Sequence, residues 1–179
     1  MSVNGVEYLR GRDSLNGRVE LVAYDAGWPE IYCDVRDDIL AALGSTSSTV
    51  EHVGSTSVPG LASKPVIDIV LLVKDSAAEK TYIPQLEAVG FLHRLREPGW
   101  FEHRLLKHKV HEVNLHVFTA GCEEATRMIR FRDYLRSNQD ARIEYEQIKR
   151  RLADQKWTFM QDYADAKGKT IRALLAQFR

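Results

Sequence analysis

Apolar and polar positions follow two different patterns along this chain, and the change between them divides it into two parts. In the first two-thirds, short apolar runs bounded by Gly, Pro, Asp or Ser have the length of β-strands. In the last third, apolar residues recur every three or four positions, which indicates helices. The predicted fold is therefore α+β, an α/β mixed sheet with helices packed against it and a helical C-terminal part.

The same pattern sets the bounds of the expected elements. The runs that we predict to be strands are 19–24, 49–53, 66–73, 91–95, 100–107 and 110–119. The expected helices are 25–43, with Asp25 as its cap, 77–89, 123–137, 140–156 and 159–179, with Gly168 as a potential break. Residues 1–18 are rich in Gly, Asn, Ser and Arg without periodicity, so we expect a weakly ordered arm followed by one domain over 19–179.

Composition limits the classes of function. The chain has 25 Lys and Arg and 25 Asp and Glu, so its formal net charge is zero and it does not attract nucleic acid as a whole. We therefore expect a small-molecule substrate. Cys33 and Cys122 form no CxxC pair, no apolar run reaches the roughly 18 residues of a membrane span, and the first residues lack the apolar core of a signal peptide. These features predict a soluble cytoplasmic protein without a membrane partner.

The most informative residue is Asp68, an acid inside the apolar run 66–73. Burying a carboxylate without a partner is costly, so Asp68 requires one. Because side chains alternate along a strand, Asp68 projects from the start of its strand, near the Gly54-Ser55 loop. Backbone amides of such a loop, together with Lys64, can bind phosphate oxygens, and one carboxylate plus substrate phosphates can bind Mg²⁺. The alternative is a structural ion pair between Asp68 and Lys64 or an arginine.

The segment 51–69, Glu-His-Val-Gly-Ser-Thr-Ser-Val-Pro-Gly-Leu-Ala-Ser-Lys-Pro-Val-Ile-Asp-Ile, resembles the signature of the GrpB family, within the nucleotidyltransferase superfamily. The similarity extends over about residues 19–178. Further segments that support it are 24–29, 114–117, 131–136 and 145–149, together with Tyr163 and Lys167. The resemblance implies a nucleotidyltransferase-like fold. It also implies a link to coenzyme A metabolism, because similar domains occur fused to dephospho-coenzyme A kinase.

The superfamily pattern is Gly-Gly or Gly-Ser, about a dozen residues, and then Asp-x-Asp or Asp-x-Glu on a strand. Gly54, Ser55 and Asp68 match this pattern, but the position of the second carboxylate is Val70. Two carboxylates on one strand face normally hold the pair of metal ions that orients a nucleoside triphosphate. With Val70, this strand supplies one ligand, so the others come from elsewhere or the metal chemistry is absent.

The last expected strand offers a source of further ligands. Glu112, Asn114 and His116 share its polar face, opposite an apolar face. If this strand lies beside the strand of Asp68, Glu112 or His116 completes a metal or catalytic site. The alternative is the solvent-facing side of an antiparallel sheet. A histidine-based zinc site is not predicted, because His111 and His116 point to opposite faces of the strand.

Two basic residues border the buried stripes of the C-terminal helices. Arg132 lies at the edge of the stripe formed by Met128, Phe131 and Leu135, and Lys149 borders a similar stripe on the next helix. Both could reach a cleft between helix and sheet and clamp phosphates there. The alternative is an aliphatic stem that covers the core while the charged head stays in water.

These residues lead to two hypotheses about function. The first is a transferase or ligase that uses a nucleoside triphosphate and Mg²⁺ to modify a small-molecule acceptor. The roles expected in it are catalysis by Asp68 and His116, metal binding by Asp68 and Glu112, and phosphate binding by Gly54, Ser55, Thr56, Lys64, Arg132 and Lys149. The second is a non-catalytic nucleotide- or phosphate-binding module, which Val70 favours and which could be an accessory to coenzyme A metabolism.

Overall fold

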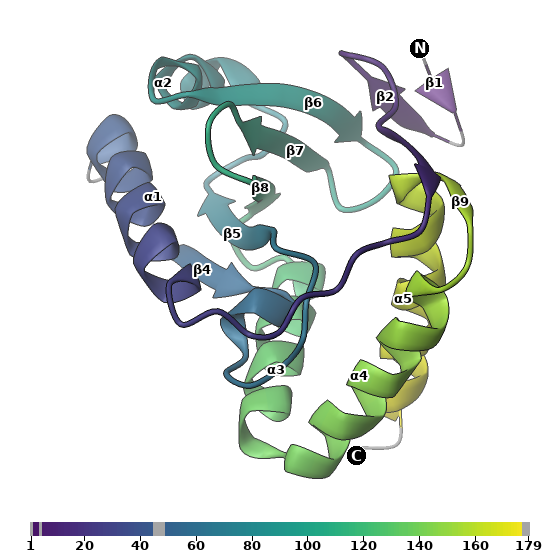
Figure 1. The fold of residues 1–179 in the computed structure, drawn as a ribbon. Coiled ribbons are helices and arrows are strands. Elements are labelled where there is room, and N and C mark those ends of the chain that lie inside the picture. Colours follow the sequence, from purple (N-terminus) through teal and green to yellow (C-terminus); the bar gives the residue numbers. More distant parts are fainter. Residues whose placement is uncertain (1, 4, 45–48, 177–179) are drawn as a thin grey trace.

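The computed structural model describes residues 2–3, 5–44 and 49–176. Their strands form a seven-stranded sheet with the order β1-β2-β6-β7-β8-β5-β4 and a two-stranded sheet, β3-β9. The strands are β1 Ser2–Val3, β2 Val6–Tyr8, β3 Ser14–Gly17, β4 Thr49–Val53, β5 Ile67–Val73, β6 Phe91–Glu97, β7 His103–His108, β8 Val113–Thr119 and β9 Trp157–Phe159. The helices are α1 Trp28–Leu43, α2 Ile83–Ala88, α3 Glu123–Ser137, α4 Gln139–Ala153 and α5 Met160–Ala176, with 3₁₀ turns at Ser55–Ser57 and Glu79–Thr81. Figure 1 shows α1 and α2 on one side of the large sheet and α3, α4 and α5 on the other.

The first face of the large sheet carries an extensive hydrophobic core and is covered by α1 and α2. Alternate residues of β5 and β8 point to this side, as the alternation in the sequence predicts. The members from these two strands are Ile67, Ile69, Leu71, Val73, Val113, Leu115 and Val117. Val35 and Ile39 of α1 and Leu86 of α2 belong to the same core. This packing fixes the two strands whose opposite face carries Asp68.

The strands β5 and β8 are neighbours in the sheet and run parallel. Asp68 lies opposite Asn114 in their register, and Val70 lies opposite His116. On the other side of β5, β4 pairs antiparallel and brings the turn at Gly54 to the start of β5. The strand adjacency on which the predicted site depends is therefore confirmed, and loop, acid and polar strand face meet at one end of the sheet.

The second face of the sheet is divided into a covered half and an open half. The helix α3 covers the first half, where Val70 and Phe118 are fully buried beside Ala125. The second half, with Asp68 and His116, lines a cavity to which α3, α4 and α5 contribute side chains. The alternative of a solvent-facing sheet side is wrong for these residues, because the C-terminal helices enclose the space above them.

The N-terminal segment differs from the prediction. In place of the weakly ordered arm expected over 1–18, the structure has three short strands: β1 and β2 extend the sheet beyond β6, and β3 pairs with β9. The open edge of β6 and the distant β9 supply backbone partners that no local pattern reveals. Conversely, 19–24 is not a strand and has an isolated bridge between Val22 and Ser63. Its apolar side chains pack into two different hydrophobic cores. Val19 packs with α4 and α5, and Val22 packs against the core below α1.

Several helix bounds are set by prolines or by tertiary pairing. The helix α3 has the predicted bounds, whereas the helix expected over 77–89 is shortened to α2, because Pro84 lacks an N–H and favours the first helical turn. The helix α4 ends at Ala153, before the segment that pairs with β3. The helix α5 continues through Gly168, so the potential break there is absent. Within the described residues, no helix has both the length and the apolar character needed to cross a membrane.

Candidate functional site

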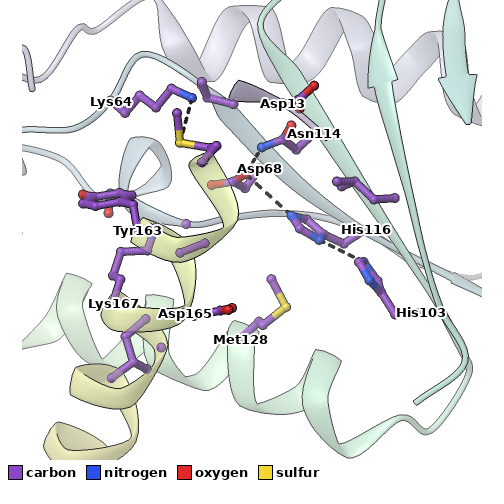
Figure 2. A pocket seen from close by; sticks show the side chains of 18 of the residues that line it. Asp13, Lys64, Asp68, His103, Asn114, His116, Met128, Tyr163, Asp165 and Lys167 are labelled. Carbon is purple, nitrogen blue, oxygen red and sulfur yellow. Dashed lines mark hydrogen bonds and ion pairs between the residues drawn. The ribbon is translucent and has the colours of Figure 1, made fainter. Parts of the chain in front are cut away.

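A cavity of about 730 Å³ lies between the open half of the second sheet face and the C-terminal helices. This volume is typical of a small-molecule site. Figure 2 shows its polar end, with Asp68, Asn114 and His116 on the strands and Tyr163 and Lys167 opposite them on α5. Side chains from the N-terminal segment and from the loop after Gly54 complete the lining. Segments that are far apart in the sequence therefore build one site.

Asp68 has two partners from β8. Its Oδ1 accepts a hydrogen bond from Asn114 Nδ2 at 2.9 Å and lies 3.6 Å from His116 Nε2. Burial by itself raises the pKa of Asp68, but the neighbouring His116, the charge of Lys167 and the hydrogen bond from Asn114 hold this pKa below its ordinary value. The side chain is 24% exposed, so an ionised carboxylate faces the cavity. Among the described residues no lysine or arginine lies within ion-pair distance of Asp68, and the near residue is His116, so the alternative of a structural pair with Lys64 or an arginine is wrong.

Gly54 allows the loop to approach Asp68 closely. Its φ of 71° and ψ of −174° lie in a region that favours glycine. A Cβ at this position would lie 2.5 Å from Asp68 Oδ2. Ser55 follows and lines the cavity, whereas Thr56 is buried and its hydroxyl donates to the Val66 carbonyl. Two of the three predicted loop residues therefore border the cavity, and Thr56 stabilises the loop from behind.

His116 belongs to a longer hydrogen-bonded chain. Its Nδ1 lies 3.1 Å from Nε2 of His103, and Nδ1 of His103 lies 2.7 Å from Oε2 of Glu97. The rings of His103 and His116 stack with their centroids 5.2 Å apart. Burial lowers the pKa of His103 to about 4, although Glu97 opposes this shift. The chain connects a carboxylate on β6 to the carboxylate of Asp68 on β5.

Three lysines that line the cavity form no ion pair with a carboxylate in the described part of the chain. Lys64 Nζ lies 3.6 Å from Met160 Sδ, Lys149 Nζ donates to the Ala62 carbonyl, and Lys167 lies over an aromatic ring of its own helix. Burial, together with the charge of Lys167, lowers the pKa of Lys149 to about 7. Burial also lowers the pKa of Lys64. Lys149 is 2% exposed, so the alternative of a solvated head is wrong for this residue.

Arg132 and Glu112 are placed differently from the other predicted residues. Arg132 lines the cavity, but its guanidinium is bound by Glu51 at 2.6 Å and by Asp133 at 2.8 Å and donates to the His52 carbonyl. It therefore fastens α3 to β4, with a buried head. Glu112 precedes β8, is exposed and lies outside the set of residues that line the cavity. The structure thus brings Arg132 to the site as an anchor and leaves Glu112 away from it.

Magnesium is the cation that the superfamily pattern implies. In the position of the second carboxylate, Val70 is buried below α3 beside Phe118. Among the described residues, no group of three or more His, Cys, Asp or Glu side chains is arranged to hold a metal ion. Mg²⁺ accepts a single protein carboxylate when substrate phosphates and water complete its coordination. The residues therefore fit one ion held by Asp68 and a substrate, and they do not fit a pair of ions.

Comparison with known proteins identifies the family. The family model described as GrpB protein matches residues 18–177. The chain belongs to the GrpB family. A UPF0157 protein of Halalkalibacterium halodurans is 49% identical over 160 residues, which cover 89% of this chain and 82% of the relative. A dephospho-CoA kinase of Mycolicibacterium paratuberculosis is 27% identical over 170 residues, which cover 79% of this chain and 41% of that protein.

Solved structures agree with this assignment. The conserved protein GrpB from Enterococcus faecalis superposes with a TM-score of 0.67 and 25% identity, covering 86% of this chain and 98% of the other. Cid1, in complex with its short product ApU, superposes with a TM-score of 0.51 and 12% identity, covering 72% of this chain and 42% of the other. The predicted GrpB family and the predicted nucleotidyltransferase-like fold are confirmed.

Several residues of this GrpB site were not predicted from the sequence to be site residues. Lys167 follows Tyr163 by one helical turn, and both lie in a segment that resembles the family, which was the available signal. Tyr145 has the helical spacing of a core position; it is buried and in contact with the cavity. Glu97 and His103 come from two strands, and only the strand register reveals their contact.

Proposed function

We propose that this GrpB protein is a nucleotide-dependent transferase or ligase that acts on a small-molecule acceptor. The observation that carries the proposal is the set of three lysines, Lys64, Lys149 and Lys167, in the cavity that the ionised carboxylate of Asp68 also lines. Among the described residues none of the three ammonium groups pairs with a carboxylate. The polyphosphate of a nucleoside triphosphate supplies the negative charge that these groups lack.

The lysines come from three elements and act on one another. Lys64 belongs to the loop before β5, Lys149 to α4 and Lys167 to α5. Burial is the largest cause of the lowered pKa of Lys64 and of Lys149; the charge of Lys107 comes next for Lys64, and the charge of Lys167 lowers the pKa of both. Charged lysines therefore destabilise one another in the cavity, and an anion between them gains the favourable energy of three charges in a partly dehydrated site.

The reaction that this arrangement supports best is nucleotidyl transfer. A nucleophilic atom of the acceptor forms a bond to the α-phosphorus, the bond from that phosphorus to the oxygen bridging to the β-phosphate breaks, and pyrophosphate leaves. His116 Nε2, beside Asp68 Oδ1, is placed to take the proton that the acceptor loses. A Mg²⁺ held by Asp68 and the phosphates supplies charge neutralisation when bound.

The likeness to Cid1 supports the proposal at the level of fold. Cid1 was solved with its short product ApU, so a protein with a similar fold forms a nucleotide product. At 12% identity the likeness is limited to the fold. The assignment of chemistry therefore rests on the lysines, Asp68 and His116 of this chain.

The second candidate is a nucleotide- or phosphate-binding module without catalysis. Val70 favours it, because an apolar residue buried below α3 occupies the position of the second carboxylate. The similarity to part of a dephospho-CoA kinase supports an accessory role of such a module in coenzyme A metabolism. The two candidates share the phosphate site and differ in turnover.

Neutralising Lys167 tests the shared site. We expect Lys167→Ala to weaken the binding of magnesium-free ATP about ten- to a hundredfold, since one charged hydrogen-bond donor to phosphate is lost. Titration calorimetry measures this affinity. The matched control is Lys156→Ala, at an exposed lysine outside the cavity, which should bind like the wild type.

Turnover distinguishes the two candidates. Wild-type protein is incubated with Mg²⁺, each of ATP, GTP, CTP and UTP, and a panel of small acceptors, and pyrophosphate is measured. Release that depends on the acceptor supports the transferase. Binding that Lys167→Ala weakens, without release on any acceptor, supports the module. Equal affinities in the wild type and Lys167→Ala contradict both.

Binding should also take up a proton above pH 7. The pKa of Lys149 is about 7 in the free protein, and an adjacent phosphate raises it. At higher pH the lysine is neutral when free and charged in the complex, so affinity should fall as pH rises, by up to about tenfold per pH unit. Calorimetry in two buffers of different ionisation enthalpy counts the protons. Lys149→Met, which keeps the apolar stem, should lose the uptake; an equal uptake in both proteins contradicts the assignment.

A further inference from the structure

The chain Glu97–His103–His116 crosses three neighbouring strands and ends beside Asp68. Glu97 is on β6, His103 is opposite it on β7, and His116 is on β8. The two contacts, 2.7 Å and 3.1 Å, are hydrogen-bond distances, whereas the 3.6 Å between His116 Nε2 and Asp68 Oδ1 is longer than a hydrogen bond. The order of the contacts allows the donors to be assigned.

Glu97 sets the direction of these hydrogen bonds. A carboxylate accepts hydrogen bonds and does not donate them, so Nδ1 of His103 carries the proton that lies between the two residues. His103 is 2% exposed and packs between the rings of Trp100, Phe118 and His116, where an imidazolium is costly. The pKa of about 4 that burial gives His103 agrees with a neutral ring. Nε2 of His103 then carries no proton, so it accepts a hydrogen bond from Nδ1 of His116.

We propose that Glu97 and His103 are positioning residues that keep a proton on Nδ1 of His116 and leave Nε2 as the nitrogen that faces the ligand beside Asp68. The hydrogen-bond direction holds whether His116 is neutral or charged, because Nδ1 is the donor in both forms. The consequence for catalysis rests on the proposed function, whereas the position of the proton does not.

The direction of these hydrogen bonds explains why His116 Nε2 and Asp68 Oδ1 lie 3.6 Å apart. In neutral His116 the lone pair of Nε2 faces the oxygen of Asp68, and two acceptors do not bond to each other. An isolated His–Asp pair would instead place the proton on Nε2 and close the gap. The carboxylate of Glu97 disfavours a proton on Nε2 alone, because it keeps His103 as an acceptor for the proton on Nδ1 of His116. The space between Nε2 and Oδ1 is thus kept ready for a donated proton or for a cationic ligand.

Nitrogen NMR of the histidine rings tests the proposal. Two-bond proton–nitrogen correlations of ¹⁵N-histidine protein at about pH 7.5 report which ring nitrogen is protonated. We expect His116 of the wild type to carry its proton on Nδ1. In Glu97→Gln, whose amide can donate to His103, the fraction of His116 with a proton on Nε2 alone should increase severalfold. The matched control is Glu102→Gln, an acid of the same hairpin that pairs with Arg104.

Two results would overturn the proposal. One is a wild-type His116 that is protonated on Nε2 and bare on Nδ1. The other is a His116 pattern that is the same in the wild type, Glu97→Gln and Glu102→Gln. If Glu97→Gln does not fold, His103→Phe removes the acceptor while keeping a ring between Trp100 and Phe118, and the same shift toward Nε2 is expected.

Activity separates this inference from the proposed function. If pyrophosphate is released, Glu97→Gln should lower kcat about ten- to a hundredfold with little change in KM, which is the effect of losing an orienting partner. A shifted proton with an unchanged kcat would refute the positioning role in catalysis. If no acceptor supports release, the proposed function fails, and the NMR pattern still decides whether Glu97 and His103 fix the proton of His116.

Discussion

Replacing Asp68 by Asn should lower the rate of Mg²⁺-dependent pyrophosphate release by about 10²- to 10³-fold. The substitution keeps the shape of the side chain and removes its charge. The new amide oxygen can still accept the hydrogen bond from Asn114 Nδ2. What is lost is the carboxylate that lies beside Asn114 and His116 in the cavity, where it can face both a cation and the phosphates. The rate is measured by coupled detection of pyrophosphate, and thermal unfolding checks that the variant is folded.

Two further variants complete this experiment. Asp38→Asn removes an exposed carboxylate from α1 and should keep the wild-type rate. Glu112→Gln addresses the predicted second metal ligand; because that side chain is exposed and outside the cavity lining, we expect a change of less than about threefold. A folded Asp68→Asn protein that releases pyrophosphate at the wild-type rate would remove Asp68 from the mechanism.

Gly54→Ala should destabilise the protein by roughly 3–5 kcal/mol and disable the site. The added Cβ would lie 2.5 Å from Asp68 Oδ2, and the backbone has a conformation that L side chains rarely adopt. Either the loop or the carboxylate must move, and both belong to the phosphate site. Urea denaturation gives the free energy of unfolding, and calorimetry gives the affinity for ATP.

Gly60→Ala separates the two causes of this loss. Gly60 also has a positive φ, but a Cβ there meets no atom within 4 Å. Its substitution should therefore cost only the backbone strain, about 1–2 kcal/mol, and leave ATP binding unchanged. If Gly54→Ala were no more costly than Gly60→Ala, the close contact between Gly54 and Asp68 would not constrain the site.

The positions of the site residues were predictable to different degrees. Asp68 was identifiable because an acid in a buried strand is physically conspicuous, and the parity of β8 placed Asn114 and His116 on one face. Lys149 stood out from its position at the edge of a buried stripe. Thr56, Arg132 and Glu112 had suitable chemistry for the roles predicted, but hydrogen bonding, anchoring to Glu51 and exposure place them differently.

The sequence by itself determined the fold class, the family and the end of the sheet where the polar residues gather. These properties follow from local periodicity and from residues close together in the chain. Only the tertiary structure decided that 19–24 serves two cores, that the first residues add strands, and that α5 brings Lys167 to Asp68. It also decided the path from Glu97 through His103 to His116. The physical reason is the same in each case: these contacts join segments distant in sequence, and their energies arise from burial and pairing that exist only after the chain has packed.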